Sequence, residues 1–140
     1  MKAFACLAIA AAVSVVGGIS AAQAAPFESG YCAPGAEPSK LQATTVRYWI
    51  SLANQRDLPG MTSFLTKDVA AFDTDAREVM IGTDVLKDYD PSGTEKMEIL
   101  DLTEAGSTVV IKVREKGAAP DDVSLVTFGF KGGCIDSIAF

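Results

Sequence analysis

The 140-residue sequence contains no histidine, one tryptophan and three cysteines. Without histidine the chain has no Ser–His or Cys–His dyad, no imidazole metal ligand and no imidazole general base. Catalysis would therefore depend on carboxylates, Lys, Tyr, Arg or backbone groups. Basic residues are also few, 12 against 18 acidic ones, and they are scattered. Because phosphate binding requires clustered Lys and Arg, we expect neither nucleic acid nor an anionic membrane surface as a partner.

Long apolar runs are absent except near the N-terminus. Residues 4–16 are almost entirely apolar, Gly17 and Gly18 interrupt them, and Ala22-Gln23-Ala24 is a small-x-small sequence typical of a cleavage site. The alternative, an uncleaved anchor helix, would need roughly 20 apolar residues. The pattern predicts a signal peptide over residues 1–24, cleaved after Ala24. We expect a periplasmic or secreted protein that is not membrane-bound after cleavage.

The remaining 116 residues carry 11 basic and 18 acidic side chains, a net charge of −7. This length suits one domain with one core. Residues 25–38 hold three prolines and show little periodicity, which predicts an irregular N-terminal arm. We therefore expect a single domain over residues 39–140.

Two cysteines remain after cleavage, Cys32 and Cys134. An exported chain with two cysteines is expected to join them in a disulfide. The alternative is a redox-active or nucleophilic thiol, but the chain has no CxxC motif and no histidine to activate one. The sequence thus favours a structural disulfide between the arm and the end of the chain.

Two helices are predicted in the first half of the domain. Ser39 and Gln42 form a capping box, so we expect a helix to begin at residue 39. It should end near Arg56, because Asp57 is a good N-cap and Pro59 suits the first turn of a second, shorter helix. The expected buried stripe of the first helix is Leu41, Thr45, Tyr48, Trp49, Leu52 and Ala53.

Short apolar runs then alternate with polar turns. Runs at 69–72 and 78–81 predict a hairpin, followed by a short helix capped by Thr83 with Val85, Leu86 and Tyr89 on its apolar side. Four β-rich runs follow and predict an antiparallel meander, at 96–103, 108–115, 123–130 and 134–140.

The third of these runs is apolar on both faces. Val123 and Leu125 point to one side, while Val126, Phe128 and Phe130 point to the other. Helices would cover one face, and a second subunit is a candidate for the other, which makes a homodimer one expectation. The predicted order gives an α+β fold with two to three N-terminal helices packed on a curved antiparallel β-sheet, forming a cone with an apolar pocket.

Three stretches resemble the NTF2-like superfamily, which includes SnoaL-like proteins and ketosteroid isomerases. They are VRYW at 46–49 with NQRDLPGM at 54–61, FLTKDV at 64–69 with FD at 72–73, and FGFKGGCIDSI at 128–138. With the element order, the resemblance covers about residues 40–140. It implies an NTF2-like cone whose pocket is lined by Tyr48, Trp49, Leu52, Phe64, Phe72, Val126 and Phe128.

The resemblance to ketosteroid isomerases places Asp73 at the position of the general base. The same comparison puts Trp49 and Val126 at the two positions where those enzymes hold oxyanion donors. One such donor is worth roughly 3–4 kcal/mol, so ketosteroid isomerisation is disfavoured. Members that resemble limonene-epoxide hydrolase use an Asp–Arg–Asp set, for which Asp73, Arg114 and Asp101 are candidates. The alternative is that Arg114 and Asp101 form a surface ion pair across strands.

Three functional hypotheses follow. The first is an exported domain that binds a small apolar or amphipathic molecule in the cone. The second is a SnoaL-like or isomerase- or hydratase-type enzyme with Asp73 as general base, and the third is an assembly module that uses the open sheet face. We expect no metal, because the acidic loop that begins at Asp88 lacks the bidentate Glu of a calcium loop and has Pro91 inside it. We also expect no cofactor.

Overall fold

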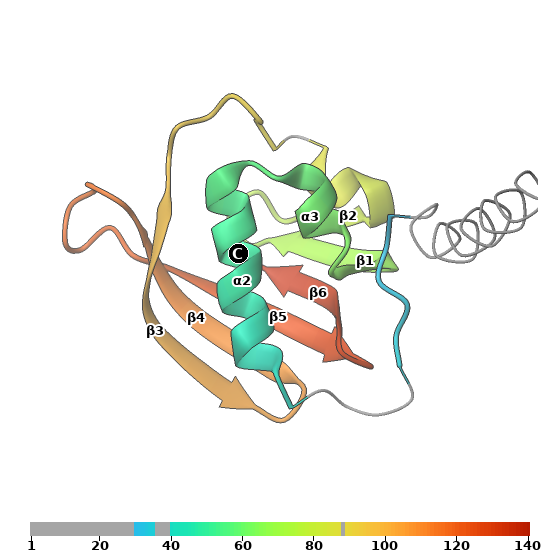
Figure 1. Ribbon diagram of the computed structural model, residues 1–140. Helices are drawn as coiled ribbons and strands as arrows, with labels where there is room; N and C mark the ends of the chain where they lie inside the picture. Colours follow the sequence, from blue (N-terminus) through green and yellow to red (C-terminus); the bar gives the residue numbers. More distant parts are fainter. Residues whose placement is uncertain (1–29, 36–39, 88) are drawn as a thin grey trace, which may run out of the picture. The chain divides into compact units, whose positions relative to one another are not determined.

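The computed structural model describes residues 30–35, 40–87 and 89–140. The predicted signal peptide and most of the predicted arm lie outside these ranges. The chain divides into two units, Met1–Gly30 and Tyr31–Phe140, and the helices and strands named below all belong to the second (Figure 1). No helix within the described ranges is long and apolar enough to cross a membrane.

The first described helix, α2 (Gln42–Gln55), begins later than predicted. Its N-cap is Leu41, which makes no side-chain capping bond, and Ser39 of the predicted capping box lies outside the described residues. The predicted buried stripe is displaced, because Leu41 is 65% exposed and Tyr48 54%. Two β-branched residues that the prediction left out occupy the buried side instead, so that the buried set is Gln42, Val46, Trp49, Ile50, Leu52 and Ala53.

Helix α3 (Leu58–Thr62) follows at once, and its predicted start is confirmed. The Asp57 carboxylate accepts a hydrogen bond from the Gly60 amide at 3.0 Å, and Pro59 lies in the first turn. Met61 is fully buried. The turn between the two helices thus fixes how α3 approaches α2.

The strands form one six-stranded sheet in the order β2-β1-β6-β5-β4-β3. The predicted hairpin and the antiparallel meander of the four C-terminal strands are confirmed. The prediction that the whole sheet is antiparallel is wrong, because β6 pairs with β1 in parallel. Pairing between strands far apart in the chain is not constrained by a hairpin, so it can take either direction. The strands are β1 (Leu65–Asp73), β2 (Glu78–Ile81), β3 (Met97–Ala105), β4 (Thr108–Glu115), β5 (Ser124–Lys131) and β6 (Cys134–Ala139).

A 3-10 helix, η1 (Gly82–Leu86), follows the β1–β2 hairpin. Its N-cap is Ile81 in an extended conformation, so the predicted cap at Thr83 is wrong. Gly82 allows the early start, since it adopts a left-handed φ of 62° directly after the strand. The chain then passes through residues 87 and 89–96 to β3 (Figure 1).

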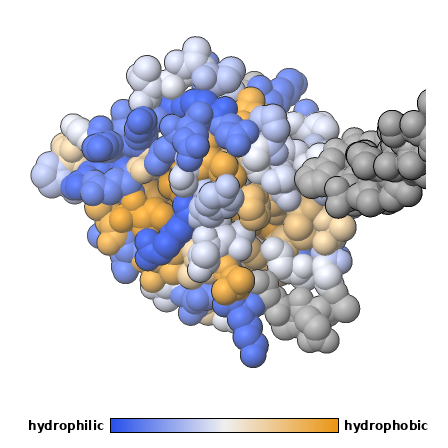
Figure 2. All heavy atoms as spheres, in the orientation of Figure 1, coloured by the Kyte–Doolittle hydropathy of each residue, from blue (hydrophilic) through white to orange (hydrophobic). Residues whose placement is uncertain are grey.

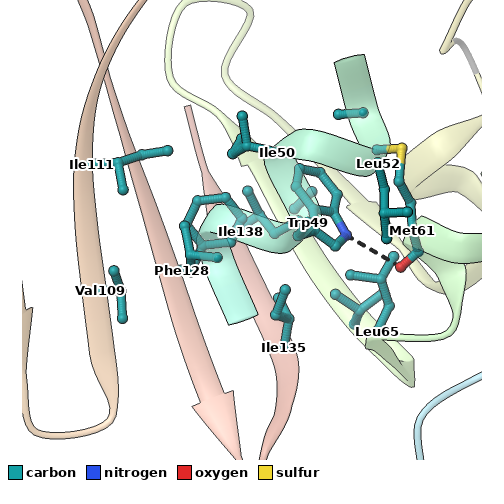
Figure 3. Close-up of a cluster of buried hydrophobic side chains, with 14 of the residues drawn as sticks. Trp49, Ile50, Leu52, Met61, Leu65, Val109, Ile111, Phe128, Ile135 and Ile138 are labelled. Atoms are coloured by element: carbon teal, nitrogen blue, oxygen red, sulfur yellow. Dashed lines mark hydrogen bonds between the residues drawn. The ribbon is translucent and has the colours of Figure 1, made fainter. Parts of the chain in front are cut away.

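We call the sheet face that packs under α2 the inner face and the opposite one the outer face. On β5, Phe128 and Phe130 are buried on the inner face, whereas Leu125 on the outer face is 64% exposed. The Trp49 ring meets the Phe128 ring edge-on at 5.5 Å between centroids, which joins α2 to the sheet (Figure 3).

The start of the second unit is fastened to the end of the sheet. Cys32 and Cys134 form the predicted disulfide, 102 residues apart in sequence. The Cys32 amide also donates to the Leu65 carbonyl, and the Gly35 amide to the Gly132 carbonyl, both at 2.8 Å. A Cβ at Gly132 would lie 2.2 Å from the Gly35 carbonyl oxygen, so only glycine fits at this approach.

Candidate functional site

A cavity of about 450 Å³ lies between the inner face of the sheet and the helices. Residues of α2, α3 and η1 form one side, residues of β3, β4, β5 and β6 form the other, and three lining residues, Tyr89, Asp122 and Phe140, come from outside these elements. The lining residues are Trp49, Ile50, Met61, Val85, Leu86, Tyr89, Met97, Val113, Arg114, Glu115, Asp122, Ser124, Val126, Phe128, Ile138 and Phe140. Most of these side chains are apolar, and three are aromatic rings besides tyrosine.

The two polar groups on the helix side of the cavity already have partners within the protein. The indole nitrogen of Trp49 donates to the Met61 carbonyl at 3.2 Å (Figure 3), and the Tyr89 hydroxyl donates to the Ala53 carbonyl. A buried polar group that is satisfied in this way gains little by turning toward a ligand. The interior of the cavity is thus suited to apolar groups.

The charged lining residues come from the ends of strands and one loop: Arg114, Glu115 and Asp122. Arg114 is already paired, because its Nη2 lies 3.2 Å from the Glu98 carboxylate. Ser124 adds a hydroxyl at the start of β5. This lining favours a ligand whose apolar part lies inside the cavity and whose polar end reaches these residues.

A shallower groove lies beside α2 on the side of β3. It shares Ile50 and Met97 with the cavity, and its remaining residues are Arg47, Ser51, Asn54, Gln55, Lys96 and Ile99. Figure 2 shows apolar residues reaching the surface on this side of α2, next to hydrophilic ones. The apolar interior therefore extends toward the surface here.

The structure brings three of the seven predicted pocket residues to the cavity: Trp49, Val126 and Phe128. Leu52 is buried in the core. The Tyr48 and Phe64 rings contact each other at 5.6 Å outside the lining, because Tyr48 is one helical position away from Trp49. Phe72 is 40% exposed on the outer face, since strand residues alternate between faces.

Asp73 lies at the end of β1, on the same side of the strand as buried Val69 and Ala71. Its Oδ1 accepts hydrogen bonds from the amides of Asp75 and Ala76, at 2.9 and 2.8 Å. These bonds form the turn that leads into β2, and Asp73 is not among the cavity-lining residues. In this arrangement the carboxylate acts as a turn residue.

The three candidates for an Asp–Arg–Asp set are not brought together. Of these, only Arg114 reaches the cavity, and the predicted Arg114–Asp101 ion pair is replaced by Arg114–Glu98. Asp101 lies opposite Lys112, and a register shift between Ile99 and Asp101 places Glu98 opposite Arg114.

Several lining residues were missed when the pocket was predicted. Val85, Leu86 and Tyr89 were expected on the apolar side of a short helix, and this signal was enough to mark them as buried but not to place them at the cavity. Phe140 follows β6 and needed the sheet order to be placed. Within the described residues, no group of three or more His, Cys, Asp or Glu side chains is arranged to hold a metal ion.

No protein-family model and no curated protein matches the sequence. Solved structures do match the fold. A SnoaL-like protein of unknown function from Burkholderia thailandensis is 18% identical, with a TM-score of 0.61 over 74% of this chain and 96% of that one. The epoxide hydrolase/cyclase-like enzyme SalBIII is 16% identical, with a TM-score of 0.58 over 69% and 86%.

An NTF2-like protein of unknown function from Cytophaga hutchinsonii is 14% identical, with a TM-score of 0.52 over 67% of this chain and 82% of that one. At these identities the likeness concerns the fold, and the fold hosts enzymes as well as proteins without a known reaction. The resemblance found in the sequence is confirmed at this level: the chain has the fold of the NTF2-like superfamily.

Proposed function

We propose that this protein, after export and signal cleavage, binds a small apolar or amphipathic molecule in the cavity without catalysing a reaction. The observation that carries the proposal is the cavity lining, in which the interior is apolar and Trp49 and Tyr89 already donate to backbone carbonyls. Apolar pockets with a few polar groups at one end are typical of small-molecule sites. The position of Val126, where isomerases hold a polar group, also supports binding without catalysis.

Filling the cavity tests the proposal. Val85→Phe combined with Val126→Phe adds two aromatic side chains from opposite sides of the cavity. We expect calorimetry to show that affinity for a neutral apolar probe, N-phenylnaphthylamine, falls at least tenfold, because added volume excludes the ligand.

The matched control is Leu125→Phe, one residue away on β5 but exposed on the outer face. It should leave the affinity unchanged. Equal affinity in the filled variant and the wild type would show that the probe binds elsewhere, and the proposal would then fail.

An enzyme of SnoaL-like, isomerase or hydratase type with Asp73 as general base is the second candidate. It is favoured by the position of Asp73 at the end of β1, on the side of Val69 and Ala71. Asp73→Ala separates the two candidates. We expect Asp73→Ala to leave the affinity for the probe unchanged and to cause no loss of turnover. The free energy of unfolding should fall by about 1 kcal/mol, because two turn hydrogen bonds are removed.

We also propose that the outer face joins two copies of the chain. Phe72 is paired with Val79, and Ala70 with Ile81, so their side chains share this face; Val79 and Ile81 are each 61% exposed. Light scattering should show a dimer that Ile81→Lys converts to a monomer, because a charge is costly in an apolar contact. Leu41→Lys, the same type of change at a similarly exposed site on the helix side, should stay dimeric. A monomeric wild type would refute this proposal.

A further inference from the structure

Arg56 has an unusual backbone for its residue type. It follows α2 with a left-handed φ of 60°. Glycine is favoured at this position, because a side chain in the left-handed region costs free energy. Because this position holds arginine and not glycine, we looked to the contacts of the Arg56 side chain for its role.

The guanidinium of Arg56 is largely covered, with 17% of its side chain exposed. Its Nη2 donates to the Glu95 carbonyl at 2.6 Å and lies 3.3 Å from the Glu95 carboxylate. Its Cζ sits 4.9 Å from the centre of the Tyr89 ring, within the range of a cation–π contact. One side chain therefore holds two points of the segment between η1 and β3.

This segment contributes Tyr89 to the cavity lining and leads to Met97, the first residue of β3, and the end of α2 holds both. The Tyr89 hydroxyl donates to the Ala53 carbonyl in the last turn of α2. The Asn54 amide makes two hydrogen bonds with the Met97 backbone, at 2.9 and 2.8 Å. Tyr89 and Met97 both line the cavity. The Arg56 guanidinium lies over the Tyr89 ring, and Arg56 follows both anchoring residues, Ala53 and Asn54, in the chain.

We propose that Arg56 is a positioning residue, which holds Tyr89 against the end of α2 and so slows release of the molecule bound in the cavity. This inference rests on the proposed ligand-binding function. The guanidinium need not touch the ligand. It keeps the Tyr89 ring in the wall, and loss of that hold allows the wall to open more often.

The positive charge of Arg56 also acts on Asp90, in the same segment. The pKa of the Asp90 carboxyl is lowered, chiefly by the hydrogen bond from the Ser92 hydroxyl, then by the Ser92 amide, and to a smaller extent by the Arg56 charge. Asp90 follows Tyr89 directly. This charge interaction agrees with the geometry, in which the cation lies over the ring next to it.

Arg56→Gly is the main test, with stopped-flow release of N-phenylnaphthylamine as the readout. The variant loses the Tyr89 and Glu95 contacts but relieves the left-handed backbone, so its unfolding midpoint should stay near that of the wild type. We expect the dissociation rate to rise roughly tenfold, as the loss of a cation–π contact and a charged hydrogen bond implies. A purely structural role would change the midpoint rather than the release rate.

Gly93→Ala tests the same contact while Arg56 is kept. A Cβ at this position would lie 2.8 Å from the Glu95 carboxylate, 3.0 Å from the Arg56 Nη2 and 3.1 Å from its Cζ, so the carboxylate must move and the guanidinium must give by a few tenths of an ångström. The release rate should rise again, by about two- to threefold, since the contact is loosened and not lost. This variant decides the matter if Arg56→Gly does not fold.

Arg77→Gly is the matched control, because Arg77 is also a left-handed arginine, with φ 57°, in the exposed β1–β2 turn. Its release rate should equal that of the wild type. A wild-type release rate in both Arg56→Gly and Gly93→Ala would overturn the role of Arg56 while leaving ligand binding intact. No binding of the probe to the wild type would overturn the proposed function, and the role of Arg56 with it.

Discussion

Replacing Cys32 and Cys134 with serine is expected to lower the free energy of unfolding by about 3–5 kcal/mol. The bond closes a loop across a sequence separation of 102 residues, so its removal returns a large conformational entropy to the unfolded chain. It also fastens Cys32 beside Leu65, where the arm meets β1. Urea denaturation of both proteins would measure the loss.

Reduction provides the control for this experiment. A reductant should destabilise the wild type by the same amount and leave the double serine variant unchanged. If alkylation before reduction labels both cysteines in exported protein, or if the serine variant is as stable as the wild type, the structural role of the bond is refuted.

Phe128→Ala is expected to lower the free energy of unfolding by about 3–5 kcal/mol. Phe128 is fully buried at the centre of the inner face, and its ring meets Trp49 edge-on. Its removal enlarges the cavity and breaks the contact through which α2 packs on β5. Thermal and urea unfolding would measure the loss.

Leu125→Ala on the same strand is the matched control, since its side chain is 64% exposed on the outer face. We expect a change within about 0.5 kcal/mol in the monomer, as for other surface substitutions. Similar losses of unfolding free energy in Phe128→Ala and Leu125→Ala would contradict the assignment of Phe128 to the buried inner face and Leu125 to the exposed outer face.

The strands were predicted well because turn residues separate them clearly. Gly106 and Gly132-Gly133 end runs whose side chains alternate, and all four observed strands begin within one residue of the start of the predicted runs. The start of α3 was also predictable, because the Asp57 cap and Pro59 act locally. Local signals of this kind do not depend on the rest of the fold.

The predictions were wrong where the structure depends on contacts between residues far apart in the sequence. The buried side of α2 is set by the sheet beneath it, which selects Val46 and Ile50 over Leu41 and Tyr48. The parallel pairing of β1 with β6 joins residues 67 to 70 positions apart, and no local pattern specifies its direction. The partner of Arg114 is likewise Glu98 and not Asp101, because a shift of register in β3 places Glu98 opposite Arg114.

The site was predictable only in part for the same reason. Trp49, Val126 and Phe128 follow from periodicity and from the family resemblance. The wall formed by Val85, Leu86 and Tyr89 depends on how a loop folds back over the end of α2, which no spacing in the sequence reveals. The contacts of Arg56 belong to this same loop.

Energy transfer from Trp49 tests the ligand-binding proposal most directly. Trp49 is the only tryptophan in the sequence and lines the cavity, so it is a single defined donor, and the cavity-filling variant shows whether the acceptor binds in the cavity. On titration with N-phenylnaphthylamine, we predict saturable transfer at one probe per chain, lost in the Val85→Phe, Val126→Phe variant and retained in Leu125→Phe. Transfer that never saturates, or that survives filling of the cavity, would contradict the proposal.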